Sequence, residues 1–166
     1  MQHAIAIRYG IIGGVGVLAY FLLFYLSNVR LFFNPVVVWS VLIVYIAAMV
    51  GACAKQRQQQ AHFSFREALR TAFLTFAIAS LCYHVFIYLM YNVIDPELME
   101  VQKELFFEQM TAMAQRFNLK DLKDQITEFS ANDFRVTVRN STMALGQSLI
   151  GGFLLALGVA ALMRRN

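Results

Sequence analysis

The chain has 166 residues, of which 59% are hydrophobic and 14% charged, and its formal net charge is +4. Because an average soluble domain carries roughly 25% charged residues, this composition excludes an ordinary soluble protein. The basic residues lie at the ends of apolar stretches and not along one polar face, so the positive charge does not predict nucleic-acid binding. We expect the lipid bilayer to be the main partner of this chain.

Four apolar stretches occupy residues 9–27, 36–54, 71–92 and 143–163. Each is about as long as the roughly 20 residues that a helix needs to cross a bilayer. The stretches and their connections leave no room for a separate soluble domain, so we predict one membrane domain over residues 1–166. The expected fold class is all-α, a four-helix transmembrane bundle with one or two amphipathic helices in the outer loop between spans three and four.

The first span follows Arg8 and continues past the length of a signal-peptide core without a small-residue cleavage site, which predicts an uncleaved signal anchor. Small residues recur at four-residue steps along several spans. They are Gly10 and Gly14 in the first span, Ala47, Ala48, Gly51 and Ala52 in the second, and Gly152, Ala156 and Ala160 in the fourth. Because such faces let helices approach closely in lipid, we predict packing within one chain, with dimerisation as the alternative.

The connection between spans two and three is short and basic. We interpret Gln56–Gln60 as a solvated polar turn, and Ser64 with Glu67 has the spacing of a capping box that starts the third helix. A docking site for a cytoplasmic partner is the alternative function of this segment. Its candidate residues are Lys55, Arg57, Arg66 and Arg70.

The third span contains the most informative polar residues. Ser80, His84 and Tyr88 follow one another at four-residue steps, so they share one helix face. An ionisable side chain inside a span is costly and usually points to the bundle interior or a wet cavity. We consider two interpretations of His84, a proton-sensing or ligand-contacting group and a neutral imidazole hydrogen-bonded to a neighbour. No Asp or Glu lies inside a span, which disfavours ion-coupled transport.

The long connection at about residues 95–140 shows helical patterns. Asp95-Pro96-Glu97 is typical of a helix start, and an apolar stripe follows at Phe106, Met110, Met113 and Phe117. A second short helix is predicted from the stripe Leu119, Leu122, Ile126 and Phe129. We expect these helices to lie over the bundle mouth, packed on the protein's own spans or docking a partner.

The distribution of charge predicts that both termini are cytoplasmic. The short connection at residues 55–70 and the Arg164-Arg165 ending are dense in basic residues, and the only acid on that side is Glu67. The long outer connection mixes six basic with nine acidic residues over 93–142. Because the positive-inside rule counts short loops and residues near span ends, the basic side is expected to face the cytoplasm.

Several short segments together resemble a known family. They are Arg8-Tyr9-Gly10, Phe63–Leu69, Asp95-Pro96-Glu97 and Arg164-Arg165. Over nearly its whole length the chain resembles the four-pass inner-membrane proteins of domain-of-unknown-function family 4199, found in bacteria of the Bacteroides–Flavobacterium type. Because that family has no established activity, the resemblance implies a topology and a bacterial inner membrane, and it implies no catalytic residues.

No catalytic, cofactor-binding or metal-ligating motif stands out, since the two cysteines and three histidines lack ligand spacing. We therefore expect a protein without enzymatic activity or a cofactor. The preferred function is an accessory or scaffold subunit of a membrane complex, with a membrane-protein partner or a homo-oligomer. The alternatives are a small transporter or channel subunit that works as an oligomer, and a membrane enzyme acting on lipid-linked substrates.

Overall fold

The computed structural model describes residues 2–60, 62–116 and 136–163. Within these ranges lie helices α1 (Gln2–Ser27), α2 (Val29–Phe32), α3 (Pro35–Gln58), α4 (Phe65–Leu89), the π-helical turn η1 (Met90–Ile94), α5 (Leu98–Arg116) and α7 (Val138–Met163). Four of the helices, α1, α3, α4 with η1, and α7, are long and apolar enough to cross a membrane. The predicted all-α bundle is confirmed, and the chain is a multi-pass integral membrane protein.

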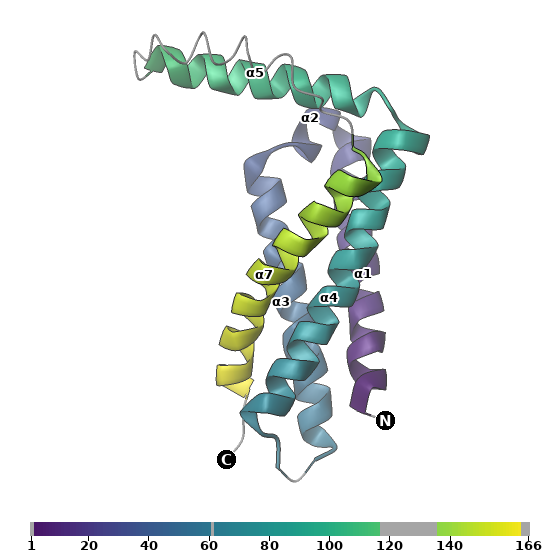
Figure 1. The fold of residues 1–166 in the computed structure, drawn as a ribbon, viewed down its shortest axis with the longest axis vertical. Helices are drawn as coiled ribbons and strands as arrows, with labels where there is room; N and C mark the ends of the chain where they lie inside the picture. The colour runs from purple at the N-terminus through teal and green to yellow at the C-terminus, as the bar shows by residue number, and fades with distance from the viewer. Residues whose placement is uncertain (1, 61, 117–135, 164–166) are drawn as a thin grey trace.

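The four long helices run side by side, and α5 lies across one end of them (Figure 1). We call this end, with α2 and α5, the α5 end. The opposite end carries the start of α1, the finish of α7 and the connection between α3 and α4 (Figure 1), and we call it the terminal end. The start of α1 and the finish of α7 therefore lie on the same side of the bundle, as four crossings require.

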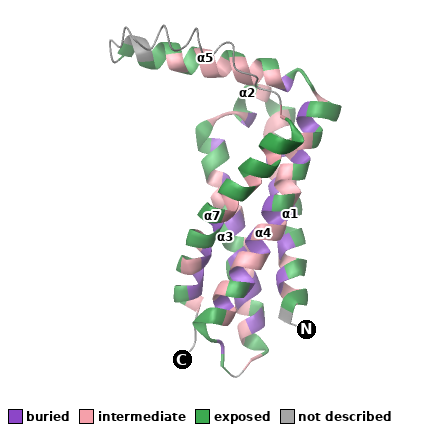
Figure 2. Cartoon of the chain, viewed as in Figure 1, coloured by how far each residue is buried: buried purple, intermediate pink, exposed green. Residues whose placement is uncertain are grey.

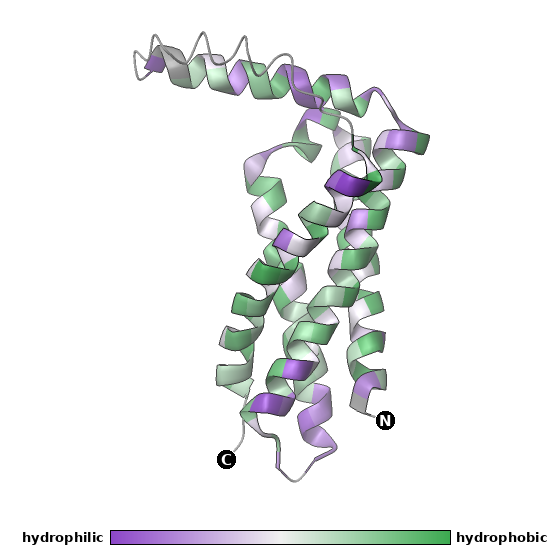
Figure 3. Cartoon of the chain, in the orientation of Figure 1, coloured by the Kyte–Doolittle hydropathy of each residue, from purple (hydrophilic) through white to green (hydrophobic). Residues whose placement is uncertain are grey.

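Exposed residues lie on the outer faces of the bundle, and buried residues lie where the helices meet (Figure 2). Side chains such as Leu23, Ile43 and Leu162 are largely exposed, at 66%, 70% and 83%. Hydrophilic residues gather at the two ends and leave a hydrophobic band between them (Figure 3). In lipid this exposure is favourable, because acyl chains solvate apolar side chains while the helices satisfy their own backbone groups.

Helix α4 packs against α1, α3 and α7. Where α1 meets α4, a Cβ built on Gly10 would lie 2.8 Å from the Cβ of Ile78, and one on Gly14 would lie 2.8 Å from the Cβ of Cys82. On α7, a Cβ at Gly152 would overlap the ring of Phe76. The predicted packing of small-residue faces within one chain is confirmed at these positions.

The helices extend beyond the predicted spans because their hydrogen bonding continues into the polar flanks. This corrects the interpretation of Gln56–Gln60 as a solvated turn, since α3 runs to Gln58. Gln56 is only 3% exposed, and its Oε1 accepts a hydrogen bond of 2.7 Å from Thr71 Oγ1 on α4. A polar residue near a helix end is buried here because a neighbouring helix supplies its partner.

The sequence signals for helix starts agree with the structure at α3 and α4 and differ from it in part at α5. The capping box of Ser64 and Glu67 is confirmed, as is Pro35 in the first turn of α3. Asp95 Oδ1 accepts from the Glu97 N–H at 3.2 Å, the contact expected of the predicted cap, but regular α5 begins only at Leu98. The delay follows from η1, because the Asp95 N–H donates to the Met90 carbonyl oxygen at 2.8 Å.

The first half of α5 is fixed to the bundle. Leu98 is fully buried, Tyr91 OH donates to Gln102 Oε1 at 2.8 Å, and Tyr25 OH donates to Asp95 Oδ2 at 2.8 Å. Arg30 of the α1–α3 connection lies 3.8 Å from Glu104 and 3.6 Å from Glu108. Of the predicted stripe, Phe106 and Met110 are half-buried and Met113 is exposed, whereas Phe117 and the second predicted helix lie outside the described residues.

Replacing Gly152 with Ala should destabilise the bundle. The new methyl group would overlap Phe76, which is 4% exposed and cannot turn aside because its ring packs 4.9 Å from that of Tyr45. We expect the free energy of unfolding in mixed micelles, followed by circular dichroism, to fall by about 1–3 kcal/mol. Gly158→Ala is the matched control, since nothing lies within 4 Å of a Cβ there. Equal stabilities of the two variants would contradict this packing.

Candidate functional site

The predicted polar face of α4 lies at its junction with α7. Ser80 is 1% exposed, and its Oγ is 2.8 Å from Ser148 Oγ. Ser148 donates its single hydrogen to the Leu145 carbonyl oxygen (2.8 Å), so the Ser80 hydroxyl is the donor between the two serines. The pair therefore joins α4 to α7 inside the membrane domain. Sequence reasoning missed Ser148, although a hydroxyl within a predicted span was a signal for such a contact.

His84 lies one turn further towards the α5 end. Its Nδ1 is 2.8 Å from the Ser80 carbonyl oxygen, which can only accept, so Nδ1 carries a hydrogen. In the neutral imidazole this leaves Nε2 as an acceptor, and Nε2 makes no hydrogen bond to another described residue. The bond of Nδ1 to the helix backbone supports the interpretation of His84 as a neutral, hydrogen-bonded imidazole. The available Nε2 supports the interpretation of His84 as a ligand-contacting group.

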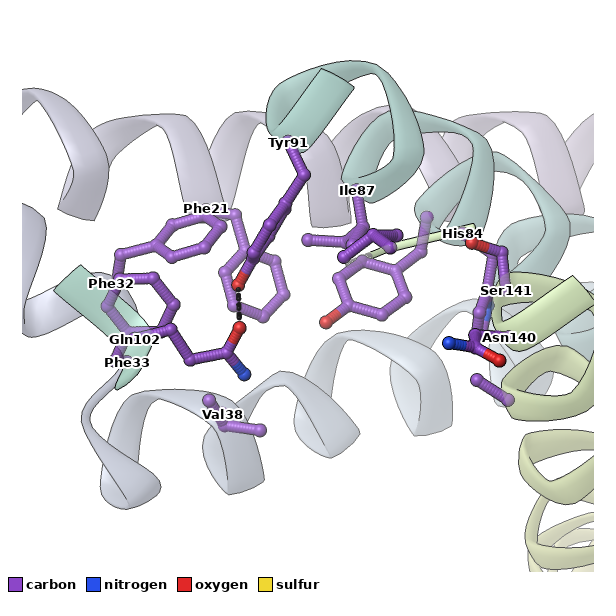
Figure 4. Close-up of a pocket in the computed structure, with 13 residues that line it drawn as sticks. Phe21, Phe32, Phe33, Val38, His84, Ile87, Tyr91, Gln102, Asn140 and Ser141 are labelled. Carbon is purple, nitrogen blue, oxygen red and sulfur yellow. Dashed lines mark hydrogen bonds between the residues drawn. The ribbon is translucent and has the colours of Figure 1, made fainter. Parts of the chain in front are cut away.

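His84 borders a cavity of about 470 Å³ at the α5 end (Figure 4). One wall is aromatic, with Phe21, Phe32 and Phe33, and Tyr91 hydrogen-bonds to Gln102 across the cavity. Asn140 and Ser141 of α7 lie on the same side as His84 (Figure 4). Tyr88, the third residue of the predicted face, instead lines a smaller neighbouring cavity of about 290 Å³ that His84 also borders.

The groups that line this cavity are suited to binding a ligand. His84 Nδ1 donates to the Ser80 carbonyl oxygen, and the Ser80 hydroxyl is hydrogen-bonded to that of Ser148. An aromatic wall with a few polar groups at one side is typical of a pocket for an amphipathic molecule. Within the described residues, no group of three or more His, Cys, Asp or Glu side chains gathers where a metal could bind.

The structure divides the predicted docking residues at the terminal end. Arg66 and Arg70, one turn apart on α4, line a cavity of about 230 Å³ together with His3 and Gln56. Lys55 and Arg57, near the finish of α3, do not line it. Sequence reasoning missed His3 and Gln56, because nothing in the spacing along the chain shows that α1 begins, and α3 ends, beside the start of α4.

Comparison with known proteins adds a family and no activity. Neither a curated protein nor a solved structure matches the chain. A family model described as "Protein of unknown function (DUF4199)" matches residues 8–165. This range contains all four long apolar helices except the first turns of α1. The chain therefore belongs to the DUF4199 family, as its short sequence segments predicted.

Proposed function

We propose that the protein is a non-enzymatic accessory or scaffold subunit of a membrane complex, and that α5 is the arm that holds the partner. The observation that carries this proposal is the position of α5. This helix has 19 residues, it crosses the α5 end of the bundle, and its second half extends past the four long helices (Figure 1). Thr111, Ala112 and Met113 on that half are exposed.

The contacts of α5 explain why it can act as a rigid arm. Its first turn is anchored by the buried Leu98, and one turn later Gln102 receives the Tyr91 hydrogen bond. Exposed ion pairs are individually weak. Arg30, however, faces both Glu104 and Glu108, so it restrains the helix on the side where the bundle ends. A helix fixed in this way presents a partner with a surface that needs little ordering on binding.

We also propose that the terminal end faces the cytoplasm and that the membrane is the bacterial inner membrane. Lys55, Arg57, Arg66 and Arg70 lie at or near the short α3–α4 connection, and Glu67 is the only acidic residue among residues 55–70. The α5 end carries Glu97, Glu100, Glu104 and Glu108. This asymmetry supports a cytoplasmic terminal end through the positive-inside rule.

The second candidate is a small transporter or channel subunit that functions as an oligomer. It is favoured by the cavity beside His84, whose Nε2 is available to a ligand. Against it, the small residues of α1 and α7 bring these helices into direct contact with α4 on the terminal side of that cavity. We therefore rank this function below the accessory role.

Partner capture should depend on the attachment of α5. Arg30→Glu places a third carboxylate beside Glu104 and Glu108, so repulsion replaces both ion pairs and should move the second half of α5, while Leu98 and Gln102 still hold its first turns. After purification in mild detergent, mass spectrometry should find a stoichiometric membrane protein with the wild type and much less of it with Arg30→Glu. Arg139→Glu makes the same charge change at the start of α7 and should retain the partner. Recovery of the protein alone, or as a homo-oligomer only, would count against the accessory role.

Transport should be absent. Liposomes containing the purified protein should show no specific proton or solute flux above empty liposomes, and His84→Ala should not change the result. A specific flux that the wild type supports and His84→Ala abolishes would instead establish the transporter alternative.

The orientation can be tested with single cysteines in intact cells. A membrane-impermeant maleimide should label Thr111→Cys on α5 directly, and Gln58→Cys at the finish of α3 only after permeabilisation. The native chain is the control, because Cys53 is fully buried and Cys82 faces Gly14 within the bundle. Labelling of Gln58→Cys from outside would reverse the proposed orientation.

A further inference from the structure

The cavity at the terminal end is built from three helices that the sequence keeps apart. His3 and Ala6 come from α1, Gln56 comes from α3, and Arg66, Glu67, Arg70, Thr71 and Leu74 come from α4. Its volume is about 230 Å³. The polar members lie near the helix ends, and the apolar Leu74 lies further along α4 towards the middle of the bundle. The cavity is therefore polar at the membrane boundary and apolar on its membrane side.

Gln56 supplies hydrogen-bond donors to this cavity. The residue is 3% exposed, and its Oε1 already accepts from Thr71 Oγ1 at 2.7 Å. The side-chain amide nitrogen has two hydrogens and donates to no other described residue. Because Gln56 lines the cavity, this amide nitrogen is available to donate to a molecule bound there.

The charged residues beside Gln56 favour the binding of an anion in the cavity. Arg66 and Arg70 are one helical turn apart and both line the cavity. The one carboxylate there, Glu67, is occupied by the capping box, in which its Oε2 accepts from Ser64 N at 3.0 Å and from Ser64 Oγ at 2.9 Å. Two guanidinium groups against one carboxylate leave a net positive charge, and guanidinium groups match phosphate oxygens in geometry.

We propose that this cavity binds the phosphate group of an anionic phospholipid from the leaflet at the terminal end. Arg66, Arg70 and the Gln56 amide would donate to the phosphate oxygens, with His3 beside them. Leu74 and Ala6 on the membrane side favour a lipid over free phosphate, because the glycerol and acyl chains of a bound lipid continue into the apolar region. The proposal is independent of the accessory role. In the orientation proposed above the leaflet is the cytoplasmic one, where basic clusters attract anionic lipid.

Native mass spectrometry of the full chain after delipidation in detergent tests this site. The probes are phosphatidylglycerol, zwitterionic phosphatidylcholine and inorganic phosphate, each titrated separately. We expect one phosphatidylglycerol to bind the wild type, with an affinity that falls about tenfold or more in Arg66→Gln/Arg70→Gln, since charge-assisted hydrogen bonds are lost. Lys55→Gln/Arg57→Gln removes the same charge from residues that do not line the cavity and should bind like the wild type.

A second variant separates the site from general charge attraction. Gln56→Met keeps the net charge and side-chain length but removes the amide donors, so phosphatidylglycerol binding should weaken. It also removes the acceptor of Thr71, but the Thr71 hydroxyl keeps the Glu67 carbonyl oxygen as an acceptor at 2.9 Å, so the melting temperature should stay near that of the wild type. Equal binding of phosphatidylglycerol and phosphatidylcholine would overturn the proposal. So would an equal loss in the two double variants, or unchanged binding in both Gln56→Met and Arg66→Gln/Arg70→Gln. Inorganic phosphate that binds as tightly as the lipid would assign the cavity to a free anion and overturn the lipid assignment.

Discussion

The close approach of α1 and α7 to α4 is the constraint on which the rest of the structure depends. In lipid, the hydrophobic effect does not drive apolar helices together. Their association is stabilised by dense packing and by the few polar contacts between them. Gly10 and Gly14 bring the backbone of α1 onto Ile78 and Cys82, and Gly152 accommodates the ring of Phe76. Helix α4 is consequently held on several sides, and both candidate sites are built around it.

The polar residues inside the bundle divide into satisfied and available groups. Thr75 donates to the Thr71 carbonyl oxygen at 2.8 Å, and Ser80 with Ser148 connects two helices, so these residues serve the fold. Among the described residues, His84 Nε2 has no donor and the Gln56 side-chain nitrogen has no acceptor, and both residues border a cavity. The available groups therefore lie near the two ends of the membrane domain, where lipid headgroups, water or a partner can reach them.

The two ends of the bundle differ in how their charged residues are used. At the α5 end, Arg30 is paired with Glu104 and Glu108, so charge there is used to fix an arm. At the terminal end, Arg66 and Arg70 face a cavity, and the nearby Glu67 is occupied in capping its own helix. An arm on one surface and a basic cavity on the other would let a small protein position a partner and an anionic lipid across the same bilayer.

The four long apolar helices could be predicted from the sequence, because the length of an apolar stretch, the capping pair of Ser64 and Glu67, and Pro35 act through neighbours in the chain. The sequence also predicted the small-residue contacts and the face containing Ser80 and His84. Three features could be seen only once the helices were packed together: Ser148 lies beside Ser80, Gln56 is buried, and α5 crosses the bundle end on Leu98. These contacts depend on how helices distant in the chain are rotated and tilted against one another, and periodicity along a single helix carries no record of that geometry.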